Sequence, residues 1–183
     1  MTLEEKLKSI LSTHKSLIRD LNLVKSLNMP NWCISAGYVR NFVWDYLHHY
    51  KDATPLNDVD VVYYDSSQQR AEADKEYEAL LKRSYPDYNW SVKNQARMHV
   101  RKKESSYSSV EDAMERWPET VTAIGVSLDQ NDHVTLVAPH GLNDLFELVI
   151  RRSPYFADYD YFIKRVLNKN WLNTWPKLRL IEE

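Results

Sequence analysis

Apolar side chains recur every three to four positions along the first part of the chain, as they do on one face of an α-helix. Over residues 2–27 this spacing predicts one or two amphipathic helices, which end at the helix-breaking sequence "NMPN". The same spacing predicts helices that begin at Gly37, that run over about 68–84, and that run over 158–171. In the last of these, the residues predicted to face inward are Phe162, Ile163, Val166 and Leu167.

Short apolar runs between the helical segments predict β-strands. The candidates are "WCISA" at 32–36, residues 59–64, "WSVKN" at 90–94, and "VIRRS", which is predicted as the last strand. Residues 120–128 and 133–139 flank "DQND", whose turn-forming residues predict a β-hairpin. Ser109 is predicted to cap a short helix, with Asp112 in its first turn. The alternation of helices and short strands predicts an α/β or α+β fold, in which helices pack on a sheet.

The composition indicates a single globular domain over 1–183, with N-terminal helices in 1–30 and a core in 31–183. Of the 183 residues, 43% are hydrophobic and 27% are charged, as is usual for a domain with one apolar core. The net charge of −2 gives no overall basic field, and therefore no strong nucleic-acid signal. The single cysteine, Cys33, excludes an intramolecular disulfide and is expected to pack in the core rather than to act as a nucleophile. Because no segment resembles a signal peptide or a membrane span, we expect a cytoplasmic protein with no membrane partner.

Asp58 and Asp60 lie at the head of the strand predicted over 59–64, although aspartate is depleted in strands. Residues i and i+2 of a strand face the same side, about 6.6 Å apart, so the two carboxylates converge on one face. Their charges repel each other unless a cation lies between them, and Mg²⁺ takes carboxylate oxygens as ligands. The pair therefore marks a candidate metal–phosphate site. Two solvated aspartates at the end of a loop are the alternative.

Gly37 lies between a predicted strand and a predicted helix, where backbone N–H groups at the helix N-terminus can meet a phosphate. It is one of only three glycines, with Gly125 and Gly141. Arg40 lies in the first turn of the same helix, where a cation opposes the helix dipole. An anionic ligand would explain this position. A surface arginine paired with Asp45 or a similar acid is the alternative.

The segment "SAGYVRNFVWDYL…PLNDVDVVYYD" combines these features in the order strand, glycine, helix with arginine, loop and D-x-D strand. It resembles the first motif of the DNA polymerase beta-type nucleotidyltransferase superfamily, in its G-G-x-V-R-D…D-x-D form of tRNA nucleotidyltransferases and bacterial poly(A) polymerases. Here Ala36 and Gly37 stand for the paired glycines, Arg40 for the arginine, and Asn41 replaces the aspartate. The later segments "WSVKNQARMH", "WPETVTAIGV", "APHGLNDLF" and "KNWLNTWP" are similar to a family of stand-alone bacterial nucleotidyltransferase-like proteins. The resemblance thus covers nearly the whole chain.

This resemblance implies a palm-type mixed β-sheet flanked by helices, in the α+β class, and transfer of NMP from an NTP to an acceptor hydroxyl. It implies that Asp58 and Asp60 are catalytic and bind Mg²⁺, with Mn²⁺ as an alternative metal. The residues implied for binding the nucleotide and its phosphates are Ser35, Gly37, Arg40, Lys93 and Asn94. The acceptor is left open by the resemblance and would be a protein side chain, a small molecule or an RNA end. RNA tailing is less favoured, because a chain of this length leaves little room for further RNA-holding domains.

A third metal-binding carboxylate commonly comes from a later strand in this superfamily, but "WSVKN" supplies none. Asn94, Glu119 and Asp144 are the candidates to complete the site. The missing carboxylate favours an alternative function, that of a non-catalytic module that binds a nucleotide or a partner protein. The intact D-x-D pair with Gly37 favours the enzyme.

Three further groups of residues have two explanations each. The polar cluster at 93–99 either contacts the nucleotide or the acceptor, or orders a loop through buried hydrogen bonds. Arg165 and Lys169, spaced i, i+4, either reach a triphosphate or lie on a solvated face, which is the commoner case. Trp171 and Trp175 are expected to seal a core rather than to stack on a base.

Overall fold

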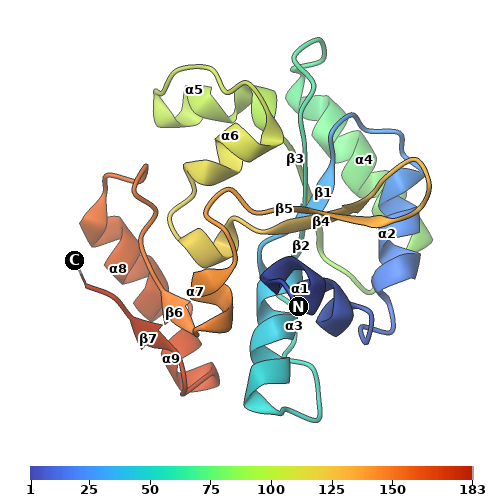
Figure 1. The fold of residues 1–183 in the computed structure, drawn as a ribbon. Coiled ribbons are helices and arrows are strands. Elements are labelled where there is room, and N and C mark those ends of the chain that lie inside the picture. The colour runs from blue at the N-terminus through green and yellow to red at the C-terminus, as the bar shows by residue number, and fades with distance from the viewer. Residues whose placement is uncertain (183) are drawn as a thin grey trace.

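The computed structural model describes residues 1–182 and contains a five-stranded β-sheet packed against helices (Figure 1). The strand order is β3-β2-β1-β4-β5. The strands are β1 (Cys33–Ser35), β2 (Val59–Tyr63), β3 (Trp90–Asn94), β4 (Gly125–Leu128) and β5 (Val134–Val137). Strands β2 and β3 are parallel, whereas the other neighbouring pairs of this sheet are antiparallel. The sheet is therefore mixed, which confirms the predicted α+β class.

The middle of the sheet is short and buried. Strand β1 has three residues, all buried, and it lies between β2 and β4. The register pairs Ser35 of β1 with Asp60 of β2, and Asp60 in turn with Ser91 of β3. The end of β1 and the start of β2 therefore lie side by side, and the helix that follows β1 begins next to the two aspartates.

Four helices bury their apolar sides against one face of the sheet in the main core. They are α1 (Leu3–Leu11), α2 (Leu17–Lys25), α3 (Gly37–His48) and α4 (Ala71–Ser84). Segment 2–27 thus forms two helices, and α1 begins with a capping box between Thr2 and Glu5. Fully buried members of this core include Leu7, Leu21, Val43, Trp44, Val61 and Leu81. Burial of one such side chain stabilises the fold by roughly 1.5–3 kcal/mol.

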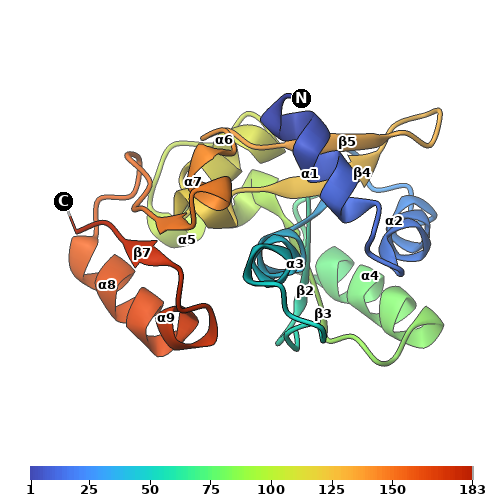
Figure 2. The same ribbon diagram turned by 60° about the horizontal axis from the view of Figure 1, so that its bottom comes forward.

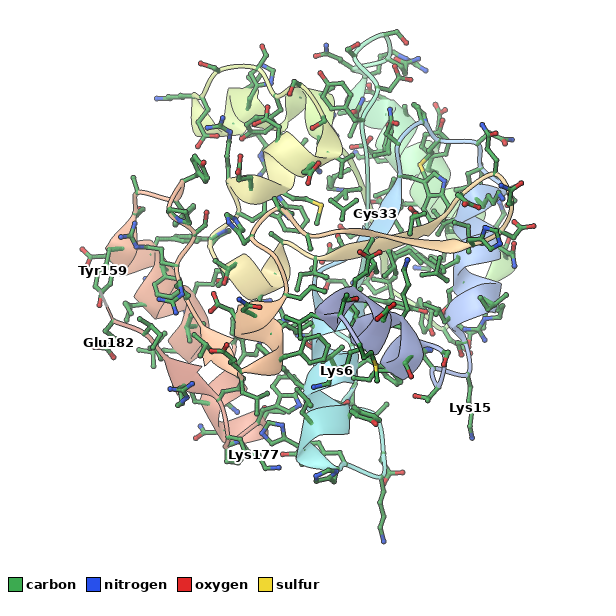
Figure 3. All side chains as sticks on the ribbon, viewed as in Figure 1. Lys6, Lys15, Cys33, Tyr159, Lys177 and Glu182 are labelled. Carbon is green, nitrogen blue, oxygen red and sulfur yellow. The ribbon has the colours of Figure 1, made fainter. Side chains whose placement is uncertain are left out.

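Helix α6 (Val110–Glu115) covers the opposite face of the sheet. This second apolar cluster consists of Cys33, Val62, Val110, Met114 and Ala123. Ser109 caps α6 as predicted, since its hydroxyl oxygen accepts a hydrogen bond from the Asp112 amide at 3.0 Å. Cys33 lies near the middle of the molecule (Figure 3), and burial raises the pKa of its thiol to about 12. The predicted packing role of Cys33 is confirmed.

The remaining elements follow β3 and end the chain. They are η1 (Gln95–Arg97), α5 (Met98–Lys102), η2 (Thr120–Thr122), α7 (Asn143–Phe146), β6 (Val149–Ile150), α8 (Tyr159–Asn168), α9 (Trp171–Thr174) and β7 (Arg179–Leu180). Strands β6 and β7 form a separate parallel pair. Figures 1 and 2 show α8 and α9 on the side of the molecule opposite α2 and α4. None of the helices within residues 1–182 has the length and apolarity needed to cross a membrane.

The C-terminal helices are joined to α3 by three tryptophans. The rings of Trp171 and Trp175 pack edge-on against Trp44, with ring centroids 5.7 and 5.0 Å away. The Trp175 indole N–H donates to Asp45 Oδ1 at 2.7 Å. Both C-terminal tryptophans are buried, which confirms that they seal a core.

The structure corrects two predicted strands. Strand β4 begins at Gly125 rather than at residue 120, because residues 120–122 form the 3₁₀ turn η2. "VIRRS" contributes only the two residues of β6, and it is not the last strand, because β7 follows it. The hairpin of β4 and β5 is confirmed.

The structure also corrects two predicted helices. Helix α4 begins at Ala71, three residues later than position 68. The segment 158–171 holds α8 and the start of α9, separated near Asn170, which has a left-handed backbone (φ 56°). Phe162 and Val166 are buried as predicted, but Leu167 is 60% exposed and does not face inward.

Candidate active-site cleft

A cleft of about 1040 Å³ opens where the end of β1, the start of β2 and the C-terminal helices meet. One wall is formed by the start of α3 and the head of β2, and the other wall by α8 and α9. The residues that line the cleft include Gly37, Arg40, Asp58, Asp60, Arg165 and Lys169. The structure therefore brings Gly37 and both aspartates into one cleft, together with cations from the distant end of the chain.

Asp58 directly precedes β2, Asp60 is its second residue, and both are half-buried. Because residues two apart in a strand face the same side, the two carboxylates point to one face. Burial, and next the charge of Asp58, raise the pKa of Asp60. The Ser91 hydroxyl and the charges of Arg40 and Lys169 oppose this shift. The ionised pair is therefore electrostatically unfavourable without a further cation between its two carboxylates.

Among the described residues, no third carboxylate joins this pair. Within residues 1–182, no three His, Cys, Asp or Glu side chains are grouped closely enough to hold a metal ion. Glu119 is fully buried, and its carboxylate accepts hydrogen bonds from Arg165 Nε at 2.7 Å and from the Thr122 hydroxyl at 2.8 Å. Asp144 instead accepts from the Thr120 hydroxyl at 2.8 Å and from Arg151.

The N-terminus of α3 faces the cleft at Gly37. The N-cap residue is Ala36, and no side chain caps this helix end. The amide groups of the first turn of α3 are therefore available to an anion in the cleft. Ala36 has φ 55° and ψ −125°, a conformation that glycine adopts far more easily than alanine. Its position matches the first glycine of the paired glycines in the sequence motif.

The three glycines differ in what the fold demands of them. A Cβ on Gly125 would lie 2.5 Å from Cys33 Sγ, so this position needs glycine for close packing. Gly141 has φ 72°, which favours glycine. A Cβ on Gly37 would meet nothing closer than Arg40 Nη2 at 3.5 Å, which is an ordinary contact. The fold therefore tolerates a side chain at position 37.

Arg40 is buried at the cleft rather than exposed on the surface. Its Nη1 donates to the Thr122 hydroxyl at 2.8 Å, and its guanidinium lies 4.2 Å from the ring centroid of Trp171. Burial lowers the pKa of Arg40 to about 10, against the opposing charge of Glu119. The surface pair with Asp45 does not form, because Asp45 accepts hydrogen bonds from Thr54 and Trp175.

Arg165 and Lys169 of α8 and its C-terminal end line the same cleft. Arg165 does not lie on a purely solvated face, because its side chain is 26% exposed and bonded to Glu119, whereas Lys169 is exposed. The charge of Lys169 reaches Asp60. These two residues follow the D-x-D pair by more than a hundred positions, and only their i, i+4 spacing and charge pointed to them.

The other nucleotide-binding residues suggested by the sequence are placed differently. Ser35 is fully buried and does not line the cleft, and its hydroxyl donates to the Asp60 carbonyl at 3.4 Å. Asn94 is also fully buried, and its side chain bonds to the backbone of the loop after β2, through Asp65 and Gln68. This supports the loop-ordering explanation for Asn94. Lys93 lines the cleft, but its ammonium pairs with Glu78 at 2.8 Å.

Thr122 is a cleft residue that sequence reasoning missed. It lies in η2, within a segment whose β-branched residues predict a strand, and nothing in the local pattern marks its hydroxyl as a partner of Arg40. The contact joins residues 82 positions apart.

The fold and the cleft together define a polymerase beta-type nucleotidyltransferase domain. The chain belongs to a nucleotidyltransferase family, whose model, described as "Nucleotidyltransferase", matches residues 22–180. A comparison with curated proteins found no match.

Solved structures of CCA-adding enzymes share this fold. One NMR structure, described as revealing a CCA-adding enzyme head domain, is 29% identical with a TM-score of 0.84, over 98% of this chain and 96% of that chain. The Thermotoga maritima CCA-adding enzyme complexed with tRNA is 20% identical, with a TM-score of 0.58 over 96% of this chain and 42% of that chain. A CCA-adding enzyme in complex with CTP is 18% identical, with a TM-score of 0.59 over 100% of this chain and 44% of that chain. The chain thus spans less than half of the length of these two enzymes.

Proposed function

We propose that the protein is a Mg²⁺-dependent nucleotidyltransferase that transfers NMP from an NTP to an acceptor hydroxyl and releases pyrophosphate. The observation that carries this proposal is the meeting of Asp58, Asp60, Gly37 and Arg40 in one cleft. Membership of a nucleotidyltransferase family supports it.

The two aspartates fit a hard divalent cation. They offer carboxylate oxygens on one half-buried face, where burial and the neighbouring charge of Asp58 raise the pKa of Asp60, and a divalent cation between them would offset this repulsion. Asp58 and Asp60 would hold Mg²⁺, or Mn²⁺, which when bound neutralises the triphosphate and favours ionisation of the acceptor hydroxyl. With only two carboxylates, the rest of the coordination shell would come from phosphate oxygens and water.

The phosphate end of the nucleotide is assigned to the start of α3. The amides that begin at Gly37 point to the cleft side, and the absence of a Cβ there leaves room for close approach of a phosphate. Arg40 offers N–H groups from the same helix, and Lys169 adds a second cation from the far wall. Binding of a triphosphate would offset the cost of burying the Arg40 charge.

The acceptor would be a hydroxyl of a protein side chain, a small molecule or an RNA end. A nucleotide substrate is supported by a fold neighbour that binds CTP, and another neighbour binds tRNA. Those two enzymes are more than twice as long as the aligned part of this chain, so their acceptor does not transfer directly.

One observation favours a second function, that of a non-catalytic nucleotide-binding module. The described residues hold no group of three metal-binding side chains at the cleft, and Glu119 is engaged by Arg165 and Thr122. Both functions require nucleotide binding, but only the first requires pyrophosphate release.

The test is a thermal shift with each NTP, with and without Mg²⁺, on the wild type and on the double variant Asp58→Asn/Asp60→Asn. The wild type should be stabilised by at least one NTP with Mg²⁺, and the double variant should lose the Mg²⁺-dependent part. Asp52→Asn, at an exposed position, is the control and should respond as the wild type does. A double variant that responds to Mg²⁺ and NTP like the wild type would place the metal site elsewhere. Pyrophosphate release with protein, small-molecule and RNA acceptors then separates the enzyme from the binding module.

A further inference from the structure

A continuous chain of hydrogen bonds connects the two walls of the cleft. Arg40 Nη1 of α3 donates to the Thr122 hydroxyl at 2.8 Å, and that hydroxyl donates to Glu119 Oε2 at 2.8 Å. The other oxygen of Glu119, Oε1, accepts from Arg165 Nε of α8 at 2.7 Å. Glu119 is fully buried and Thr122 nearly so, and each carboxylate oxygen of Glu119 accepts one of these hydrogen bonds.

The positive and negative charges along this chain of hydrogen bonds do not cancel. It contains two guanidinium groups and one carboxylate, and Arg40 itself is buried. Asp58 and Asp60 are the other carboxylates whose charges act on Arg40. When a divalent cation neutralises those two, the chain from Arg40 to Arg165 keeps one excess positive charge. A buried excess charge is costly unless a counter-ion compensates for it.

The two arginines also keep N–H groups for a ligand. Arg165 uses Nε for Glu119, which leaves its terminal nitrogens, at a side chain that is 26% exposed and lines the cleft. Arg40 is held at Nε and Nη2 by the Asn41 side chain and at Nη1 by Thr122, so its plane is fixed. Fixed guanidinium groups bind phosphate oxygens with little loss of side-chain entropy.

We propose that Glu119 and Thr122 are positioning residues that set Arg40 and Arg165 as a two-arginine clamp on the polyphosphate of the nucleotide. This inference rests on the proposed function, because it assumes that an NTP binds in the cleft. Glu119, which the sequence suggested as a third metal ligand, thus acts through the two arginines instead. The Thr122 hydroxyl links Glu119 to Arg40 and so orients Arg40, whereas Glu119 orients Arg165 directly through their ion pair.

The experiment titrates tripolyphosphate in excess Mg²⁺ into the protein by isothermal calorimetry, with wild type and Thr122 variants. Thr122→Val keeps the shape of the side chain and removes the hydroxyl, and it should weaken binding about tenfold or more, because a hydrogen bond to a charged group is lost. Thr122→Ser restores the hydroxyl and should bind within about threefold of the wild type, by the same hydrogen-bond argument. Thr120→Val is the matched control: Thr120 lies in the same turn and also donates to a carboxylate, that of Asp144, but it does not line the cleft.

Each outcome decides between the explanations. Binding by Thr122→Val equal to that of the wild type, or an equal loss in Thr120→Val, would overturn the positioning role. If Thr122→Val does not fold, Arg165→Gln replaces it, since this side chain is partly exposed. A tenfold loss in Arg165→Gln supports the clamp, and unchanged affinity overturns it. A wild type that binds neither an NTP nor tripolyphosphate would overturn the proposed function itself, which the NTP thermal shifts detect separately.

Discussion

Replacement of Gly37 by alanine is expected to have opposite effects on the stability of the fold and on nucleotide binding. The new Cβ would lie 3.5 Å from Arg40 Nη2, 3.6 Å from Asn41 Nδ2 and 3.7 Å from Leu56 Cδ2, all of them ordinary contacts. A glycine in a helix makes the folded protein less stable than an alanine would by roughly 0.5–1 kcal/mol, chiefly because glycine gives the unfolded chain more conformational freedom. Gly37→Ala should therefore raise the melting temperature by about 1–4 °C, since 1 kcal/mol corresponds to about 2–4 °C in a domain of this size.

The same Cβ should harm nucleotide binding. It projects between three side chains that line the cleft, into the space that a phosphate would use to approach the amides of α3. At an NTP concentration of 100 times the dissociation constant, binding stabilises the wild type by about 2.7 kcal/mol. If alanine weakens binding tenfold, the same concentration gives only about 1.4 kcal/mol. The NTP-induced thermal shift should thus fall to about half.

The control for Gly37→Ala is Gly125→Ala, at a glycine that the fold does require. Its Cβ would lie 2.5 Å from Cys33 Sγ and 3.1 Å from Cys33 Cβ, within the buried sheet. Overpacking of this kind costs about 1–3 kcal/mol, so this variant should melt at a lower temperature than the wild type. If Gly37→Ala also melts lower, the fold requires that glycine. If it melts higher but binds NTP as tightly as the wild type, Gly37 has no role in phosphate binding.

Three further predictions concern stability and reactivity. The pKa of Asp60 is raised in the folded protein, so its ionised carboxylate destabilises the fold; this destabilisation is absent below the unfolded pKa and complete above the folded pKa. Asp60→Asn should therefore raise the melting temperature at pH 8. An increase of the same size at about pH 3.5 would show that it does not come from the charge of Asp60. Ala36→Gly removes a backbone strain of about 1–3 kcal/mol, but it costs about 0.4–1 kcal/mol because glycine gives the unfolded chain more conformational freedom. The urea midpoint of unfolding should therefore rise. A lower midpoint would show that Ala36 is not strained. Cys33, with its thiol pKa raised to about 12, should react with a thiol reagent at pH 8 only after unfolding; rapid labelling of the native protein would be inconsistent with its burial.

The local part of the site could be predicted from the sequence because neighbouring residues determine it. Strand alternation places Asp58 and Asp60 on one face, and the strand–glycine–helix order places Gly37 beside them. Each of these relations spans a few dozen residues and follows from backbone geometry. The same reasoning gave the central strands, the hairpin and the cap of α6.

The predictions that failed depend on tertiary contacts. Residues 120–122 are all β-branched, which favours a strand, but the hydrogen bonds of Thr120 to Asp144 and of Thr122 to Glu119 hold them in a 3₁₀ turn. Leu167 continues the apolar spacing of α8, yet the helix contacts the core along a narrower stripe through Phe162 and Val166. In both cases the sequence pattern was compatible with two local structures, and the tertiary contacts determined which of them formed.

The far wall of the cleft could not be predicted for the same reason. The ion pair of Arg165 with Glu119 joins positions 46 apart, and the bond of Arg40 to Thr122 joins positions 82 apart. Once these contacts exist, Arg40, Arg165 and Lys169 lie close to Asp58, Asp60 and Glu119 around one part of the cleft. Glu119 is enclosed by its two partners, whereas both aspartates line the cleft. Under the proposed function, a metal ion would have two carboxylates to bind and a polyphosphate would have the cations around it. The role proposed for Glu119, to hold the two arginines, would then explain why it does not serve as the third metal-binding carboxylate.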